Sequence, residues 1–282
     1  MVNSDNEENP EENFSTWGAI QKKDRSGSRL TRRRRKYPSY WPIILGLLGT
    51  IVLPALLLVP VGIIEVHLHP NLVNGALGST TLQNKITSDF TDNVLCLLAT
   101  LILTWTALIL PVFVTGKRYF QGWKNLVKWK FAWKQDILIA LAFTVIMRTV
   151  EWIVNLILEK GPHLNPSTLS NGGLITSSGT KWIWLLGLAA SIGAPIAEEL
   201  FFRGMTFTII SKKLGKFFGI FLSSLLFGLA HLQATVASSI YMFLTTFTIG
   251  ACLAFLFSKT GRLGTSLLSH GMFNASAILL SF

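Results

Sequence analysis

The stretch IAEELFFRG at residues 196–204 places two glutamates and an arginine inside a segment that otherwise resembles a membrane span. A charged side chain at the middle of a spanning helix costs about 2.5–3.5 kcal/mol, and carboxylates near a span's end cost less. Charges kept at such a cost usually pair with one another or serve a function. We therefore expect Glu198, Glu199 and Arg203 to face the interior of a helical membrane protein.

The composition of the chain supports a membrane location. Of its 282 residues 50% are apolar and only 14% are charged, and the mean hydropathy is +0.48, whereas a soluble domain would carry more charge. The net charge of +11 is concentrated in a basic run at residues 29–36 and in short segments between apolar runs. A nucleic-acid binder would carry its basic face on a soluble domain, so we expect no nucleic-acid partner. Cys96 and Cys252 lie in separate apolar runs and form no metal-ligand spacing.

Apolar runs of about 20 residues, the length that crosses a bilayer, predict seven transmembrane helices. The runs cover residues 41–64, 94–114, 137–158, 182–210, 217–257 and 263–282. The run 217–257 is long enough for two crossings, and its predicted break lies at 233–239. The predicted fold class is therefore all-α, a polytopic membrane helical bundle.

The distribution of lysine and arginine predicts the topology. The basic residues at 29–36, 117–134, 212–216 and 259–262 fall on one side of the membrane if the spans alternate. The opposite loops, 65–93 and 159–181, carry few basic residues. The positive-inside rule then places the N-terminus in the cytoplasm.

The segment KRYFQGWKNLVKWKFAW at 117–133 has its own pattern. Phe120, Trp123, Val127 and Phe131 share one helical face with lysines largely between them, which favours an amphipathic helix in the cytoplasmic interface. The alternative is a loop with scattered interfacial aromatic residues.

The three charged residues of the fourth predicted span differ in whether they can form an ion pair on the helix. Glu199 and Arg203 stand four residues apart with the acid first, the better order for a helical ion pair. Glu198 points about 100° away on a helix, so it faces another surface, where an unpaired carboxyl suits proton transfer. Pro195, which lies three residues before Glu198, is expected to kink the helix.

Two further predicted spans carry histidines. Phe227 and His231 stand one turn apart in FGLAH, and His270 and Asn274 one turn apart in HGMFN. A single histidine on an apolar helix is usually a hydrogen-bonded core residue, but several buried polar groups on different helices can satisfy one another. A further intramembrane cluster consists of Arg148, Glu151 and Asn155. Its helical spacing favours a structural ion pair over a substrate contact.

The ordered motifs EExxxR at 198–203, FxxxH at 227–231 and HxxxN at 270–274 resemble those of the CPBP family of intramembrane proteases. That family includes the type II CAAX prenyl endopeptidases and the bacterial Abi proteins. The resemblance covers roughly residues 182–282 and implies a helical core whose polar cavity opens to the cytosol. We therefore expect a disordered basic cytoplasmic tail at 1–40, N-terminal transmembrane helices at 41–181 with the interfacial segment 117–133, and a catalytic core of the family's type at 182–282.

The resemblance also implies residue roles. Glu198 and His231 would activate water, while His270 and Asn274 would polarise the scissile carbonyl. From the residue types, we expect Glu199 with Arg203 to fix the helix and the local electric field, and Phe227 to contact the substrate. The residue types suit peptide hydrolysis, which needs a base, a proton for the leaving amine and donors for the oxyanion.

The partners implied are membrane lipids and a hydrophobic or lipidated peptide substrate, of which a prenylated CAAX-type chain end is one candidate. We expect a multi-pass protein of a bacterial-type cell membrane rather than of the endoplasmic reticulum. For cofactors, the carboxylates and histidines could form a zinc site, yet no HExxH motif is present, and we favour catalysis without metal. The alternative functions are a proton-coupled transporter and a non-catalytic scaffold or immunity protein of the same fold.

Overall fold

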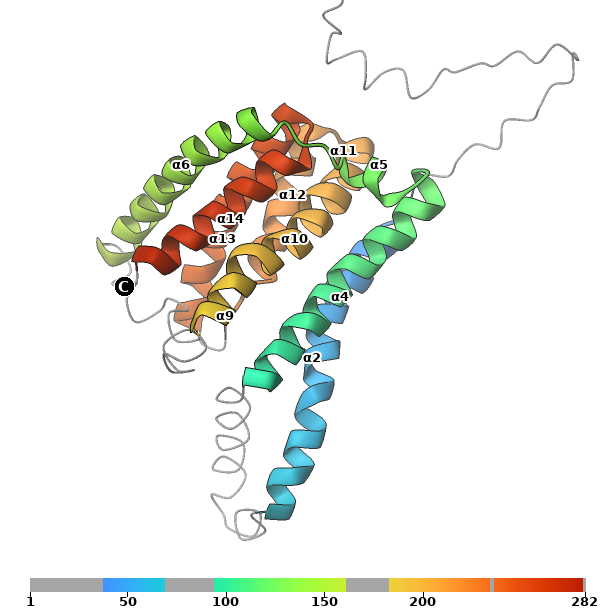
Figure 1. Ribbon diagram of the computed structural model, residues 1–282, viewed down its shortest axis with the longest axis vertical. Coiled ribbons are helices and arrows are strands. Elements are labelled where there is room, and N and C mark those ends of the chain that lie inside the picture. Colours follow the sequence, from blue (N-terminus) through green and yellow to red (C-terminus); the bar gives the residue numbers. More distant parts are fainter. Residues whose placement is uncertain (1–37, 69–93, 161–182, 234–235, 281–282) are drawn as a thin grey trace, which may run out of the picture. The chain divides into compact units, whose positions relative to one another are not determined.

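The computed structural model describes residues 38–68, 94–160, 183–233 and 236–280. All regular structure in these ranges is helical, which confirms the predicted all-α membrane protein (Figure 1). The predicted tail at 1–40 and the loops at 65–93 and 159–181 lie almost entirely outside the described residues. Their predicted features, and the domain boundaries drawn from them, stay predictions.

Each of the seven predicted spans corresponds to a helical segment of the structure. Six of these are α2 (Trp41–Leu68), α4 (Val94–Tyr119), α6 (Trp133–Lys160), α12 (Lys216–Leu229), α13 (Val236–Thr260) and α14 (Leu263–Leu280). The seventh is a composite segment made of α9 (Ile183–Leu188), η4 (Ala189–Gly193), α10 (Ala194–Glu198), η5 (Glu199–Phe207) and α11 (Thr208–Leu214). Four described segments are long and apolar enough to cross a membrane: 95–119, 133–158, 184–214 and 236–260. The chain is therefore an integral membrane protein, and the count of seven crossings stays a prediction.

The composite segment is helical along the length expected for 182–210, but it is not α-helical throughout. Two of its parts, η4 and η5, are π-helical, with hydrogen bonds from residue i to residue i+5 that widen the turn. Where a kink at Pro195 was expected, the structure has a π-helical turn just before the proline. A wider turn suits a proline, whose ring would clash with the carbonyl four residues earlier in an α-helix.

The fifth predicted span is shorter than expected. α12 has 14 residues and ends at Leu229, so it covers about 21 Å at 1.5 Å per residue, less than the hydrocarbon core of about 30 Å. His231 consequently lies in the turn that follows the helix, where its N–H donates to the carbonyl of Gly228 at 3.1 Å. The predicted break at 233–239 corresponds to the end of α12 and the start of α13 at Val236.

The segment 117–133 forms a much shorter helix than the expected amphipathic one. α4 continues to Tyr119, and only α5 (Trp123–Val127) is helical in the remainder. Gln121, Gly122 and Lys128 have positive φ angles of 62°, 132° and 52°, and these left-handed residues end a right-handed helix. The side chains of Phe120, Leu126 and Val127 are buried in the bundle.

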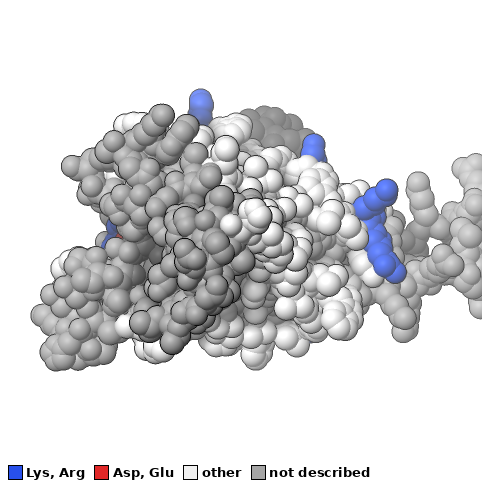
Figure 2. All heavy atoms as spheres, turned by 90° about the horizontal axis from the view of Figure 1, so that it is seen from below, with Lys and Arg blue, Asp and Glu red and all other residues white. Residues whose placement is uncertain are grey.

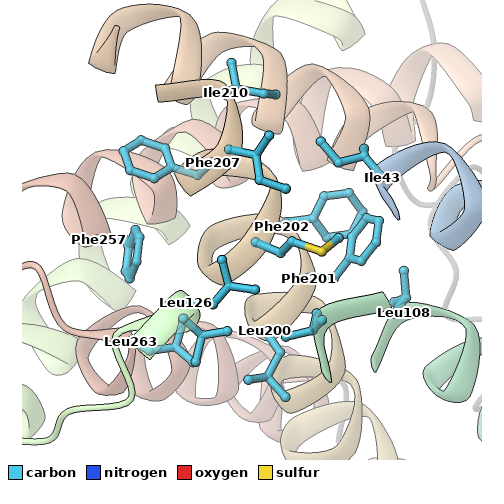
Figure 3. Close-up of a cluster of buried hydrophobic side chains, with 14 of the residues drawn as sticks. Ile43, Leu108, Leu126, Leu200, Phe201, Phe202, Phe207, Ile210, Phe257 and Leu263 are labelled. Atoms are coloured by element: carbon cyan, nitrogen blue, oxygen red, sulfur yellow. The ribbon is translucent and has the colours of Figure 1, made fainter. Parts of the chain in front are cut away.

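The hydrophobic core is centred on η5. Every residue of this element is buried, and its side chains meet residues from most of the other helices (Figure 3). These partners are Ile43 of α2, Leu108 of α4, Leu126 of α5, Phe257 of α13 and Leu263 of α14. The element that carries Glu199 and Arg203 is thus the one around which the bundle packs.

α6 and α14 are joined by a polar contact near the middle of their lengths. Arg148 pairs with Glu151 on its own helix and donates to the carbonyl of Phe273 and to the hydroxyl of Ser276, the latter at 2.9 Å. Its guanidinium also lies over the ring of Phe273, 3.9 Å from the centroid. These contacts support the structural role predicted for the Arg148 and Glu151 pair.

A substitution at Gly204 tests whether α5 packs closely against η5. A Cβ atom there would lie 2.6 Å from Cβ of Val127 and 3.1 Å from its Cα, so Gly204→Ala should lower the free energy of unfolding by about 1–3 kcal/mol. Gly187→Ala is the control, because its Cβ would meet Ile278 at an ordinary 3.5 Å. Thermal unfolding in detergent measures both variants, and equal midpoints would contradict the packing described here.

The buried ion pair gives a second prediction. Arg203 and Glu199 are 1% and 0% exposed, with Nη1 and Oε1 2.8 Å apart. Arg203→Met should cost about 3–5 kcal/mol, because it leaves a buried carboxylate without its partner. The double variant Glu199→Gln/Arg203→Met should unfold at a higher temperature than the single variant, since neither charge remains. A double variant less stable than Arg203→Met would show that the pair does not explain the loss.

Candidate active site

Glu198 and Glu199 sit at the junction of α10 and η5, the last residue of one and the first of the other. Their environments differ: the side chain of Glu199 is fully buried, and that of Glu198 is 16% exposed. At the change from α-helical to π-helical turn, the carboxylate of Glu199 is therefore enclosed while that of Glu198 stays accessible. Such a separation of roles between neighbouring carboxylates is common in acid–base sites.

Glu199 is held by two cationic or hydrogen-bonding groups. Its Oε1 lies 2.8 Å from Nη1 of Arg203 and 2.9 Å from Nδ1 of His270. Arg203 also donates to the carbonyl of Gly250 at 3.4 Å and lies over the ring of Phe227, 4.4 Å from its centroid. The ion pair expected from the sequence is present, and it fixes the orientation of His270.

Glu198 faces the Nε2 atoms of both histidines. Its Oε1 lies 4.0 Å from Nε2 of His231, and its Oε2 lies 3.7 Å from Nε2 of His270. These separations exceed a direct hydrogen bond of about 2.7–3.2 Å. The carboxylate of Glu198, at the end of α10, thus lies between two imidazole rings, one from the turn after α12 and one from α14.

The partners of the two Nδ1 atoms fix how the rings are protonated. Nδ1 of His231 lies 2.8 Å from the carbonyl of Phe227, and a carbonyl can only accept, so this nitrogen carries the hydrogen. Nδ1 of His270 faces the carboxylate of Glu199 and carries a hydrogen for the same reason. In the neutral form of each ring, Nε2 is then an acceptor; it becomes a donor only in the imidazolium.

Asn274 is bound to the π-helical turn before Glu198. Its Nδ2 donates to the carbonyl of Ala190 at 2.8 Å. In η4 the N–H of Ala194 binds the carbonyl of Ala189, an i to i+5 bond, and the next rung would join the carbonyl of Ala190 to residue 195. That residue is proline and has no N–H. Asn274 therefore satisfies the carbonyl that Pro195 leaves without a helical donor, and retains a second amide hydrogen for another acceptor.

Phe227 packs beneath the two histidines. Its ring is 2% exposed, and its centroid lies 4.6 Å from that of His231 and 5.9 Å from that of His270. The ring supports both imidazoles and the guanidinium of Arg203. A contact between Phe227 and a substrate stays a prediction.

The sequence did not reveal two groups that position the site. The carbonyl of Ala190 orients Asn274, and the carbonyl of Gly250 receives Arg203. A sequence motif specifies side chains, so it does not reveal which main-chain carbonyl accepts a hydrogen bond. Pro195 was the available signal for the first, because a proline inside a helix always leaves a carbonyl to be satisfied elsewhere.

Within the described part of the chain, no three or more His, Cys, Asp or Glu side chains are grouped so that they could hold a metal ion. His270 Nδ1 and Glu199 Oε1 are engaged with each other and with Arg203. The present arrangement does not fit a three-ligand metal site, and we derive no step through a metal. Metal-independent catalysis stays a prediction.

Comparison with known proteins supports the assignment of this region. Residues 180–276 match the family described as type II CAAX prenyl endopeptidase Rce1-like. The chain is 31% identical over 96 residues to a protein of Bacillus subtilis (strain 168) named "Putative membrane peptidase YdiL". That match covers 34% of this chain and 37% of the relative's length. No solved structure matches the chain significantly.

The matched region contains all three motifs, the composite segment from Ile183, and α14 as far as Ser276. The resemblance inferred from those motifs is thereby confirmed. Residues 180–276 carry a domain of the type II CAAX prenyl endopeptidase Rce1-like family.

Proposed function

We propose that the protein is an intramembrane endopeptidase that hydrolyses a peptide bond in a membrane-associated substrate, with Glu198 as the base. The observation that carries the proposal is the position of the Glu198 carboxylate between Nε2 of His231 and Nε2 of His270. The family match at 180–276 and the peptidase relative support the class of reaction.

The first step of the proposal is the binding of water between Glu198 and His231. Both Glu198 Oε1 and the neutral His231 Nε2 are acceptors, and 4.0 Å separates them. A water about 2.8 Å from each atom could donate one hydrogen to each acceptor. Its oxygen lone pairs would then be free to attack a carbonyl carbon.

In the second step, Glu198 takes a proton from the water as the oxygen bonds to the carbonyl carbon. The oxyanion needs donors, which we assign to His270 and Asn274. Because its Nδ1 carries a hydrogen towards Glu199, His270 can donate from Nε2 only as the imidazolium, and the proposal requires that form of the ring at this step. Glu198 then gives its proton to the amine as the C–N bond breaks, which returns the carboxylate.

A hydrophobic or lipidated peptide is the proposed substrate class. The apolar anchor of such a peptide could stay in lipid while its scissile bond reaches the polar cluster, because Glu198 lies on a segment long and apolar enough to cross a membrane. A prenylated CAAX-type chain end is one member of this class, suggested by the family description. Access from the cytoplasmic side is part of the proposal. A transporter is not favoured, because the charged groups on the described apolar helices are grouped at the motifs and at the Arg148–Glu151 pair instead of following a path across the bundle.

Substitution of the base is the main test. Glu198→Gln keeps the shape of the side chain but cannot accept the proton, so it should abolish cleavage while the thermal unfolding midpoint stays near that of the parent. The assay uses full-length protein in liposomes with a farnesylated peptide and the same peptide without the lipid. Near-parental cleavage by Glu198→Gln would dismiss the mechanism. Cleavage of both peptides at equal rates would remove the lipidated substrate class but keep the peptidase.

The order of effects among the other site residues provides a sharper prediction. His231→Ala should be nearly as severe as Glu198→Gln, because the water loses its second acceptor. Asn274→Ala should lower the rate by about 10²–10³ and should also lower the unfolding temperature, since the carbonyl of Ala190 loses its donor. Asn274→Asp, which can still accept but lacks the amide donor, is the comparison variant. An Asn274→Ala variant as inactive as Glu198→Gln would contradict this order.

A chelator tests the absence of a catalytic metal. We expect cleavage in liposomes to be unchanged after incubation with a strong zinc chelator and dialysis. The structural reason is that His270 Nδ1 and Glu199 Oε1 are committed to each other and to Arg203. Loss of activity that is restored by added zinc, but not by magnesium, would contradict the metal-free mechanism and leave the peptidase assignment intact.

A further inference from the structure

The turn that carries His231 contains no local signal that would end the helix before it. α12 ends at Leu229, and the next residues are Ala230, His231, Leu232 and Gln233, none of which is glycine or proline. Alanine, leucine and glutamine favour the helix, so local preference alone would continue α12. Figure 2 views the end of the bundle at which α12 ends and α13 begins, and the charged side chains of the described surface lie at its margins there. The end of α12 therefore depends on an uncharged contact with another element.

The hydroxyl of Ser239, in the first turn of α13, makes that contact. It accepts the N–H of Gln233 at 2.9 Å and donates to the carbonyl of the same residue at 2.7 Å. In a continued α-helix the N–H of Gln233 would bind the carbonyl of Leu229. That carbonyl accepts instead from the N–H of Leu232, over a tighter turn, at 3.4 Å. Ser239 thus takes the hydrogen bond that another α-helical turn would need.

The early end of the helix releases the carbonyl of Phe227 for the imidazole of His231. In an α-helix this carbonyl would accept from the N–H of His231, four residues later. Here that N–H binds the carbonyl of Gly228 at 3.1 Å, and the imidazole Nδ1 lies 2.8 Å from the carbonyl of Phe227. The neutral ring therefore carries its hydrogen on Nδ1 and has Nε2 as an acceptor, 4.0 Å from Oε1 of Glu198.

The hydrogen bonds of the turn are otherwise made within α12 and the turn itself. The carbonyl of His231 accepts from Nε2 of Gln233 at 3.3 Å. The N–H groups of residues 230–232 bind carbonyls of α12, as main-chain groups away from water require. Among the hydrogen bonds that these described residues make, those to Ser239 are the ones that reach another helix. The path of the turn thus depends on one hydroxyl of α13.

We propose that Ser239 is a positioning residue for His231: by ending α12 at Leu229, it holds the imidazole as the Nδ1–H tautomer with Nε2 facing Glu198. The importance of that tautomer for cleavage rests on the proposed function, in which Nε2 of His231 accepts a hydrogen from water. Without the hydroxyl, residues 230–233 should continue the helix. The N–H of His231 would then displace Nδ1 from the carbonyl of Phe227, and the ring would be free to place its hydrogen on Nε2.

The first test compares cleavage by three variants of the full-length protein in liposomes. Ser239→Ala removes the hydroxyl, and Ser239→Thr keeps it. The matched control is Ser258→Ala, because the hydroxyl of Ser258 is also on α13 but donates to Phe255 of the same helix, at 2.8 Å. The thermal unfolding midpoint of each variant is measured in parallel.

We expect Ser239→Ala to lower kcat by about 10–100-fold, because misplacing a reacting group by about 1 Å can cost about 10²-fold. KM should change little, since the hydroxyl lies away from the substrate. Ser239→Thr and Ser258→Ala should keep a kcat near that of the parent. A parental kcat in Ser239→Ala, or a Ser239→Thr variant as slow as Ser239→Ala, would overturn the proposal. So would equal losses of kcat in Ser239→Ala and Ser258→Ala, because the effect would then be one of general stability.

A second measurement needs no substrate. Nitrogen-15 NMR of histidine-labelled protein in detergent distinguishes a ring nitrogen that carries a hydrogen from one that does not, and His231→Ala identifies the signals of His231 by their loss. At a pH that keeps the ring neutral, the parent and Ser239→Thr should show the Nδ1–H tautomer of His231. Ser239→Ala should show a mixture of the two tautomers. If Ser239→Ala fails to fold, Ser239→Cys should show a smaller change in the same direction, because a thiol is a weaker donor and acceptor.

The NMR result separates this proposal from the peptidase assignment. An unchanged tautomer in Ser239→Ala, or in Ser239→Cys if that variant replaces it, would overturn the role of Ser239, whatever the cleavage assay shows. A changed tautomer together with a parent protein that cleaves no peptide would reject the peptidase and support the positioning of His231 by Ser239.

Discussion

The ion pair between Glu199 and Arg203 is the constraint on which the rest of this structure depends. Two opposite charges in the interior of a membrane protein are tolerable only when each compensates the other and the remaining polar atoms find partners. Here the guanidinium also reaches the carbonyl of Gly250 on α13 and the ring of Phe227 on α12. The carboxylate holds His270 on α14. One pair on η5 thereby joins the three helices that bring the site together, and it leaves Glu198 as the carboxylate without an arginine.

Much of this could be predicted from the sequence because it depends on local spacing. The four-residue separation of Glu199 and Arg203, the apolar runs and the three motifs are properties of short segments, and the helices, the ion pair and the family resemblance followed from them. The π-helical turns, the early end of α12 and the brevity of α5 did not follow. They depend on how close Gly204 comes to Val127 and on which turns the packed bundle can accommodate, and such information is not contained in periodicity. The roles assigned to the site residues stay predictions that the variants must test.

Pro195 creates a need for a hydrogen-bond donor that a residue far away in the chain supplies. The proline deprives the carbonyl of Ala190 of a helical donor, and an amide on α14 supplies it. Gly271, beside His270 on the same helix, comes so close that a Cβ atom there would lie 2.8 Å from the carbonyl of Ser191. The π-helical turn and α14 are therefore in main-chain contact. This contact sets the distance between the helix that carries the glutamates and the helix that carries His270.

The short length of α12 has a consequence for how the chain enters the membrane. A helix of 14 residues is too short to cross the hydrocarbon by itself, whereas α13, with 25 residues, is long enough. Insertion of α12 alone would leave the main-chain groups of its final turn, around His231, exposed to lipid at a cost of several kcal/mol per group. The two helices should accordingly partition into the bilayer together, as a hairpin, after α13 has been synthesised. The site would then be complete only once α14, which brings His270 to Glu199 and Asn274 to Ala190, has also joined the bundle.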